Sequence, residues 1–200
     1  MKTYKLHTNS KKILADTFTP VSVYLKIRDK FPNSLLLESS DYHANDNSFS
    51  FICFNPIANF SIENNVITKQ YPDHSIEKKD IQNQNVIEEL SQFSQQFETE
   101  SETFKFINNG LFGYISYDAI QYFDKINIKE KSPENEIALI QYAVYQNIIA
   151  INHFNNEAYI FCHSFEDVNN IAEIEQLLQN KSFASFSFKK ENEVVSNLKD

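Results

Sequence analysis

The chain has 200 residues, of which 42% are hydrophobic and 14% aromatic, so it can bury the core of one large domain. Its formal net charge is -9, and lysine and arginine occur in no run beyond a pair. That charge repels phosphate backbones and anionic lipid head groups, so we expect neither nucleic acid nor a membrane surface as a partner. With no apolar stretch of spanning length and no signal-peptide core near the N-terminus, we expect a cytoplasmic protein.

The N-terminal region predicts a short strand and a helix. Residues 4–6 are expected to form the strand, followed by a polar turn through residues 9–12. Thr19-Pro20 is typical of a helix N-cap with proline at the first helical position, and apolar residues recur at helical spacing from Val21 to Phe31. The helix is expected to end at Pro32.

An antiparallel meander is predicted next. Residues 35–39 and 49–54 have the composition of paired strands, and residues 58–62 and 66–70 that of a hairpin turning at Asn64-Asn65. Both predictions rest on β-branched and aromatic residues bounded by polar turn residues.

The middle of the chain predicts a polar surface loop over residues 71–85 and then a helix. Val86, Leu90, Phe93 and Phe97 lie about one helical turn apart, which indicates one buried face. An acidic exposed link is expected over residues 98–102.

A long hairpin is predicted from residues 137–151 and 158–162, turning at Asn155-Asn156. Asp167 is expected to cap a last helix, and residues 183–188 alternate as a final strand. The whole pattern indicates an α+β fold: a mainly antiparallel β core, resembling half of a sandwich, flanked by helices.

Cys53 and Cys162 each lie among aromatic and aliphatic neighbours, in FICFN and YIFCHS. A thiol in such surroundings is typically a small buried hydrophobe. A disulfide between the two is the alternative, although two cysteines do not make a disulfide framework.

Both glycines of the chain, Gly110 and Gly113, fall in NNGLFGYISYD. Glycine used so sparingly indicates a positive φ or a close backbone approach, and both a packing role and a functional role remain open. The stretch is not a phosphate-binding loop, because Gly113 leads into a strand-like sequence and not into a helix.

Glu38 and Ser39 end the apolar run SLLLESS, where a buried carboxylate would cost several kcal/mol without a partner. Glu38 therefore either turns outward at the strand end or meets a cation inside. His153 and His163 flank the long hairpin and could meet across it, but no third ligand has recognisable spacing, so no metal site is predicted. No catalytic residue is predicted either, because no acid/base pair or nucleophile motif stands out.

Three separated blocks resemble one enzyme family. LLLESSD followed by SFSFICFNPIA resembles the LLES…RYSFIGxxP(I/F)A pattern near the start of anthranilate synthase component I. NNGLFGYISYDAIQYF is similar to the family's GGLFGYxxYDxxRYxE stretch, and IALIQYAVYQNIIAINH to the segment that follows. Order and spacing agree over most of residues 18–163.

The resemblance implies that residues 1–200 are the N-terminal, regulatory and scaffold domain of a longer lyase of tryptophan biosynthesis. Such an enzyme converts chorismate and ammonia, or nitrogen from a glutamine amidotransferase subunit, to anthranilate and pyruvate. The family's chorismate and Mg²⁺ sites lie in a C-terminal domain that we expect to be absent here, so we expect no cofactor in this stretch and no activity from it alone.

The family's N-terminal domain contributes to feedback inhibition by L-tryptophan. The resemblance places Leu37, Glu38, Ser39 and Phe49 at the tryptophan site. It places Gly110, Gly113 and Asp118 in the neighbouring backbone, as structural residues.

Departures from the family pattern bear on effector affinity. Ser48 and Phe49 stand where the family has Arg and Tyr, or in some members Lys at the second position, and Gln121 stands at an Arg position. Asn109 and Ser116 replace glycines, and asparagine can keep a left-handed backbone.

Two alternatives remain open at this point. One is the same domain of aminodeoxychorismate synthase component I, in the folate pathway; the other is a non-enzymatic module that binds an amino acid. Because strands of the family's two halves lie together, we also expect the chain alone to expose sheet edges and to form a homodimer.

Overall fold

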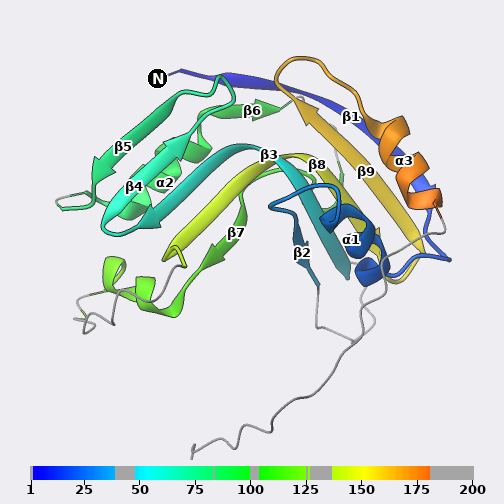
Figure 1. The fold of residues 1–200 in the computed structure, drawn as a ribbon, viewed down its shortest axis with the longest axis horizontal. Helices are drawn as coiled ribbons and strands as arrows, with labels where there is room; N and C mark the ends of the chain where they lie inside the picture. Colours follow the sequence, from blue (N-terminus) through cyan, green and yellow to red (C-terminus); the bar gives the residue numbers. More distant parts are fainter. Residues whose placement is uncertain are drawn as a thin grey trace, which may run out of the picture.

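The computed structural model describes residues 2–38, 48–82, 84–99, 104–124, 126 and 137–180. These residues form a nine-stranded sheet in the order β5-β4-β3-β8-β9-β1-β6, with β2 beside β3 and β7 beside β8. Every pairing is antiparallel except that of β1 with β6. The sheet bends like an arch (Figure 1). The strands are β1 (Tyr4–Leu14), β2 (Leu35–Leu37), β3 (Phe49–Glu63), β4 (Val66–Gln70), β5 (Ile76–Asp80), β6 (Phe97–Thr99), β7 (Phe112–Ile115), β8 (Ile140–Asn152) and β9 (Glu157–Ser164).

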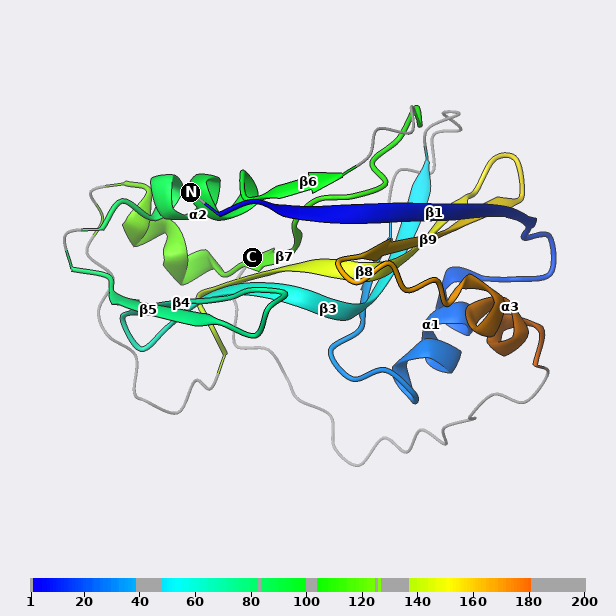
Figure 2. The same ribbon diagram turned by 90° about the horizontal axis from the view of Figure 1, so that it is seen from above.

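The helices are α1 (Pro20–Arg28), α2 (Val86–Ser94) and α3 (Ile171–Gln179), with a 3-10 helix η1 (Tyr117–Tyr122). Figure 2 shows α1 and α3 together at one end of the sheet and α2 at the other. The predicted α+β class, with a mainly antiparallel core flanked by helices, is confirmed. None of the helices in the described ranges is long and apolar enough to cross a membrane.

The predicted polar turn after residue 6 is wrong, because β1 continues to Leu14. Thr8 to Leu14 pair residue by residue with β9, so ladder hydrogen bonds keep this polar stretch extended. Ion pairs of Lys11 with Glu175 and of Lys12 with Glu157, each 2.6 Å long, accompany the pairing. A strand held by its neighbour in this way needs no apolar alternation of its own.

α1 begins as predicted, with a capping box in which the Ser22 amide donates to the Thr19 hydroxyl over 3.1 Å. The helix ends at Arg28, before Pro32. Val23 and Ile27 are its buried residues, whereas Val21 is 47% exposed.

The predicted meander is confirmed, with one difference: residues 49–54 and 58–62 belong to a single strand, β3. Its register shifts between Pro56 and Ala58, and Asn55 just before has φ 56°. This bulge lets one strand bend through the arch. The β3–β4 hairpin turns at Asn64 and Asn65, both with positive φ, as such two-residue turns require.

The predicted loop over residues 71–85 contains a strand, β5, which pairs with β4. Its sequence IEKKD gave no strand signal because its side chains are mostly exposed or charged. The following helix is α2, capped by the Asn85 side chain, and it ends at Ser94; Phe97, predicted on its buried face, opens β6 instead. Glu98, in the predicted acidic link, is exposed.

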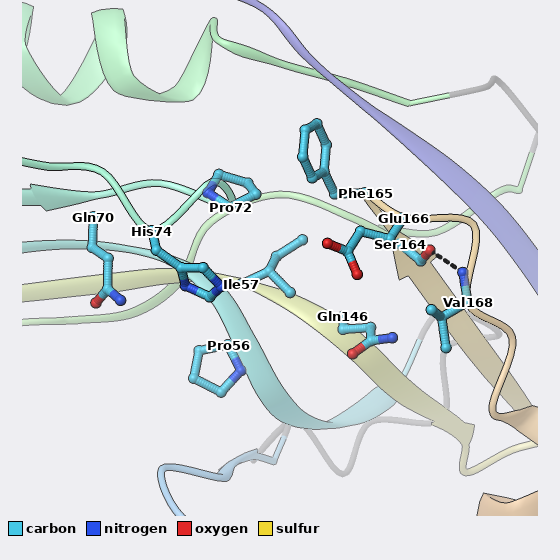
Figure 3. A pocket seen from close by; sticks show the side chains of 10 residues that line it. All are labelled: Pro56, Ile57, Gln70, Pro72, His74, Gln146, Ser164, Phe165, Glu166 and Val168. Atoms are coloured by element: carbon cyan, nitrogen blue, oxygen red, sulfur yellow. Dashed lines mark hydrogen bonds between the residues drawn. The ribbon is translucent and has the colours of Figure 1, made fainter.

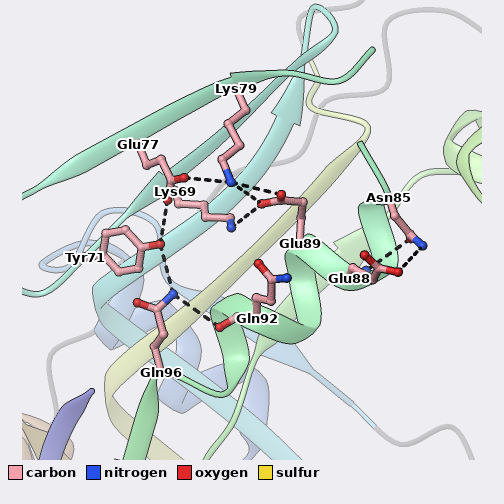
Figure 4. Close-up of polar contacts among 9 residues, drawn as sticks. All are labelled: Lys69, Tyr71, Glu77, Lys79, Asn85, Glu88, Glu89, Gln92 and Gln96. Atoms are coloured by element: carbon pink, nitrogen blue, oxygen red, sulfur yellow. Dashed lines mark hydrogen bonds and ion pairs between the residues drawn. The ribbon is translucent and has the colours of Figure 1, made fainter. Parts of the chain in front are cut away.

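A buried ion-pair network fixes α2 to the sheet (Figure 4). Lys69 Nζ of β4 lies 2.5 Å from Glu89 Oε2 of α2, and their side chains are 3% and 9% exposed. Lys79 of β5 donates to the same carboxylate over 3.1 Å. Burial alone would raise the pKa of Glu89, but the two ammonium groups hold it below the ordinary value.

The C-terminal hairpin is confirmed as β8 and β9, and Asn156 has φ 53° in its turn. Asp167 does not cap α3, because the helix begins four residues later and its N-cap position is Asn170. The predicted strand at residues 183–188 lies outside the described residues. Cys53 and Cys162 are both buried and free, as their apolar neighbours predicted.

Alternation along β3 gives the central sheet two faces. Ile52 and Phe54 belong to a core cluster that α1 and α3 cover with Val23, Ile27 and Ile174. Phe51 and Cys53 point the other way, into a second cluster rich in aromatic rings. Two of the site residues predicted from the sequence, Leu37 and Phe49, lie on that second face.

Candidate functional site

The β2–β3 hairpin positions the residues that the sequence nominated. Leu35 lies opposite Cys53 and Leu37 opposite Phe51, so both leucines share the aromatic face. Leu37 is 37% exposed, and Glu38, the next residue, is exposed. The outward orientation of Glu38 is therefore the one observed, while Ser39 lies outside the described residues.

Phenylalanine and tyrosine side chains gather over this side of the sheet. Phe49 stacks on Phe106 with ring centroids 4.4 Å apart, and Phe104 meets Phe161 edge-on at 4.9 Å. Such offset and edge-on pairs stabilise beyond the area that they bury. We call this the aromatic face; it comprises Phe49, Phe51, Phe104, Phe106, Phe112, Tyr159 and Phe161.

The segment before β7 packs on the aromatic face. Phe104 and Phe106 come from this segment, and Phe106 also lies 5.0 Å from the ring of Tyr159 in β9. Rings from β3, β9 and this segment therefore meet although they are far apart in the sequence. Phe49 belongs to this cluster, and Leu37 lies opposite Phe51, another of its members.

The two glycines serve different backbone needs. A Cβ on Gly113 would lie 1.9 Å from the Gln141 carbonyl oxygen, so β7 and β8 approach closely there. Gly110 has φ 139° with open space around it, so its conformation and not its packing requires glycine. Gly113 therefore matches the predicted close backbone approach, and Gly110 matches the predicted positive φ.

Phe112, next to Gly113, links this stretch to the aromatic face, with its ring 6.0 Å from that of Phe51. Asp118 follows in η1, where its backbone carbonyl accepts from the Gln121 side chain over 2.9 Å. Gly113 thus borders the candidate site through Phe112, whereas Asp118 lies one element further along the chain.

His163 is fully buried beside the aromatic face, stacked on Phe161 at 5.9 Å. Its Nε2 lies 2.8 Å from the Asn108 carbonyl, which can only accept, so Nε2 carries the proton. Nδ1 then accepts from the Thr8 hydroxyl over 3.0 Å. Burial lowers the pKa of His163, and the bond to Asn108 only partly opposes this.

The two histidines flanking the long hairpin do not form a pair. His153 Nε2 lies 2.7 Å from the Ser50 hydroxyl, whereas His163 faces Thr8 and Asn108. In the part of the chain that the structure describes, no three His, Cys, Asp or Glu side chains converge as metal ligands. These residues offer no fit for Mg²⁺.

The site can therefore offer an apolar wall, with the carboxylate of Glu38 next to Leu37. Rings and leucines suit the body of an aromatic ligand, and Glu38 suits a cationic group. The sequence could have shown the wall, because FSF, FKF and YIF each place two aromatic residues two positions apart, on one face of an extended segment. No family motif of the sequence pointed to the segment at residues 104–106.

Comparison with known proteins decides the family. The model of the chorismate binding enzyme family matches residues 33–200. This chain belongs to that family.

Curated relatives with similar sequences share one name. Anthranilate synthase component 1 of Lactococcus lactis subsp. lactis is 28% identical over 171 residues, covering 85% of this chain and 34% of its own length. The protein of that name from Methanothermobacter thermautotrophicus is 29% identical, covering 82% and 32%. The chain thus spans about a third of the length of these relatives.

A crystal structure of anthranilate synthase component I from Streptococcus pneumoniae TIGR4 matches with a TM-score of 0.48 and 18% sequence identity. The match covers 86% of this chain and 36% of that one.

Proposed function

We propose that this chain is the N-terminal domain of an anthranilate synthase component I. The observation that carries the proposal is the family match over residues 33–200 together with curated relatives of that name. Those relatives favour anthranilate synthase over aminodeoxychorismate synthase and over a module without enzymatic activity. The complete protein is then a lyase of tryptophan biosynthesis that acts in the cytoplasm.

The chain supplies one wall of an effector site for L-tryptophan. Leu37, which lies opposite Phe51, and Phe49 on the aromatic face suit the indole, and the exposed carboxylate of Glu38, next to Leu37, suits the ammonium group. Ser39, by its place in the LLESS motif, is assigned a hydrogen bond to the ligand. The opposite wall belongs to the part of the relatives that this chain does not match.

The remaining requirements of the reaction fall outside this domain. Mg²⁺, which supplies Lewis-acid chemistry at chorismate in this family, has no ligand set among the described residues. A glutamine amidotransferase subunit delivers ammonia to the complete protein. The chain alone is inactive under this proposal.

The isolated domain is also assigned a tendency to dimerise. Among the described residues β7 pairs only with β8; Ile115 at its end and Tyr117 just after it are 45% and 85% exposed. Light scattering of the chain at high concentration should show a mass above that of the monomer; a clean monomer contradicts this part of the proposal.

The test uses the protein encoded by the complete reading frame. Incubated with chorismate, ammonia and Mg²⁺, it should form anthranilate, detected by its fluorescence. Formation of aminodeoxychorismate instead assigns the sister enzyme, and absence of both products refutes the proposal.

The effector site is tested in the same assay with Ser39→Phe. The added ring should block tryptophan and raise its inhibitory concentration at least about tenfold, which corresponds to about 1.4 kcal/mol of binding free energy. Ser91→Phe, on the exposed side of α2, should leave inhibition unchanged. Unaltered inhibition of the Ser39 variant would remove this residue from the site.

A further inference from the structure

A cavity of about 320 Å³ lies away from the aromatic face, between three segments distant in the sequence (Figure 3). The β3 bulge contributes Pro56 and Ile57, and the turn between β4 and β5 contributes Pro72 and His74. The chain leaving β9 contributes residues 164–166 and 168. None of the residues assigned to the tryptophan site lines it.

A buried asparagine network joins two of these segments. The Asn55 side chain donates to Asn147 Oδ1 over 2.8 Å, and Asn147 in turn donates to Asn170 Oδ1 over 2.8 Å. Asn147 is fully buried. The bulge and the loop before α3 are therefore held at a fixed separation, because breaking this network would leave buried amide groups unpaired.

The loop after β9 is fixed a second time by its own hydrogen bonds. The Val168 amide donates to the Ser164 hydroxyl over 2.6 Å, and the Cys162 thiol donates to the Val168 carbonyl over 3.1 Å. Asp167 between them has φ 56°. Together these contacts hold Glu166 at the rim of the cavity.

The opposite wall is a tight turn. The His74 amide donates to the Tyr71 carbonyl over 2.9 Å, and His74 itself has φ 64°. All three walls are thus set by contacts within the protein, so the cavity is formed before any ligand arrives, which lowers the cost of binding.

The lining favours a ligand with an apolar body and a cationic group. Pro56, Ile57, Pro72 and Phe165 offer apolar surface, and the amide of Gln146 offers a carbonyl oxygen. Among the described lining residues Glu166 is the one Asp, Glu, Lys or Arg, so the formal charge is negative. Anionic ligands would meet this carboxylate without a lysine or arginine to balance it.

We propose that this cavity binds a small organic amine, with its ammonium on Glu166 and its apolar body against Ile57 and the two prolines. In Figure 3 the Glu166 carboxylate lies beside Ile57, with His74 on the other side of that residue. A volume of about 320 Å³ lies near the lower end of the roughly 300–1,000 Å³ that is typical of small-molecule pockets in proteins. A small amine that carries one aromatic ring suits a pocket of this size.

Phenethylamine is the probe for this proposal, and 3-phenylpropionate is its anionic counterpart of similar shape. Each is titrated into the chain labelled at its 5 histidines, and the ring signals are followed by NMR. The signal of His74, assigned from its loss in His74→Gln, should move in a saturable manner with phenethylamine and remain still with phenylpropionate. Equal response to both ligands, or no response to the amine, overturns the proposal.

Glu166→Gln separates charge recognition from simple filling of the cavity. Because Glu166 is exposed, this change leaves the fold intact, and it should weaken phenethylamine binding at least about fivefold at low salt. Glu98→Gln, at an exposed position of β6, should leave binding unchanged. Unchanged affinity in the Glu166 variant refutes the assigned contact.

Discussion

Two regions of the sheet are held by different contacts. At the α2 end, Glu89 of α2 meets β4 and β5 through a carboxylate that serves both Lys69 and Lys79, beside the apolar packing of Val86 and Phe93. On the aromatic face, the segment before β7 is held by ring contacts shared among several side chains, such as Phe106 with Phe49 and Tyr159. The charged contact depends on one residue, whereas the aromatic contact is distributed, so we expect substitution to be far more costly at the first.

Glu89→Gln should have the largest effect. It leaves the Lys69 ammonium, 3% exposed, without its carboxylate, and a buried charge that loses its partner costs about 3–5 kcal/mol. The free energy of unfolding, measured in urea by circular dichroism, should fall by that amount.

Lys79→Met is the matched control for this network. Its side chain is 36% exposed, so its removal should cost less than about 1 kcal/mol. Equal losses in the two variants would show that the burial of Lys69 does not determine the loss of stability, and the contrast between the α2 end and the aromatic face would fail.

Only part of the fold could be predicted from the sequence. Hairpins with strong alternation and asparagine turns, such as β8–β9, were predictable because local composition and burial agree. β5 and the second half of β1 were not, because their strands are polar and stay extended only through pairing with a neighbour. Asp167 was mistaken for a cap since any acidic residue before an apolar helix gives the same signal.

Some features of the candidate site could be predicted from the sequence, and others could not. The close approach at Gly113 followed from the rarity of glycine, and the position of Leu37 and Phe49 on paired strands followed from the hydrophobic pattern. The contact of Phe106 with Phe49 did not, because the pattern FKF shows an aromatic face on its segment but not which strand that face meets. The Lys69–Glu89 pair was hidden for the same reason: nothing in two separated charges shows that they will be buried together.

Phe106→Ala tests the distributed contacts of the aromatic face. Phe106 is half-buried and contacts several rings, so its removal should cost about 2 kcal/mol, less than the 3–5 kcal/mol typical of a fully buried phenylalanine. The exposed aromatic face should also bind the dye ANS. Ile107→Ala, one position along and 64% exposed, should change neither quantity by a measurable amount. A loss as large as that of Glu89→Gln would remove the distinction between the α2 end and the aromatic face.

The smallest expected effect is a pH dependence at the edge of the aromatic face. Burial lowers the pKa of His163 in the folded protein, so the unfolded chain binds the proton more readily. The stability that neutral His163 provides is therefore complete above its unfolded pKa of 6.5 and is lost as the pH falls from there through the lowered folded value. Glu77, Glu89 and Glu157 have folded pKa values below 4.5, so the losses linked to them come at lower pH.

His163→Gln isolates this contribution. Glutamine can still donate to the Asn108 carbonyl and accept from Thr8, yet it cannot take up a proton. Between about pH 7 and about pH 5.5 the melting temperature of the original protein should fall by a few degrees, and that of the variant should fall less. His153→Gln, which changes a histidine bonded to Ser50, serves as the control and should keep the original slope. Parallel slopes for His163→Gln and the original protein would mean that the ring accepts a proton within the fold at no cost, and that the edge of the aromatic face is open to water.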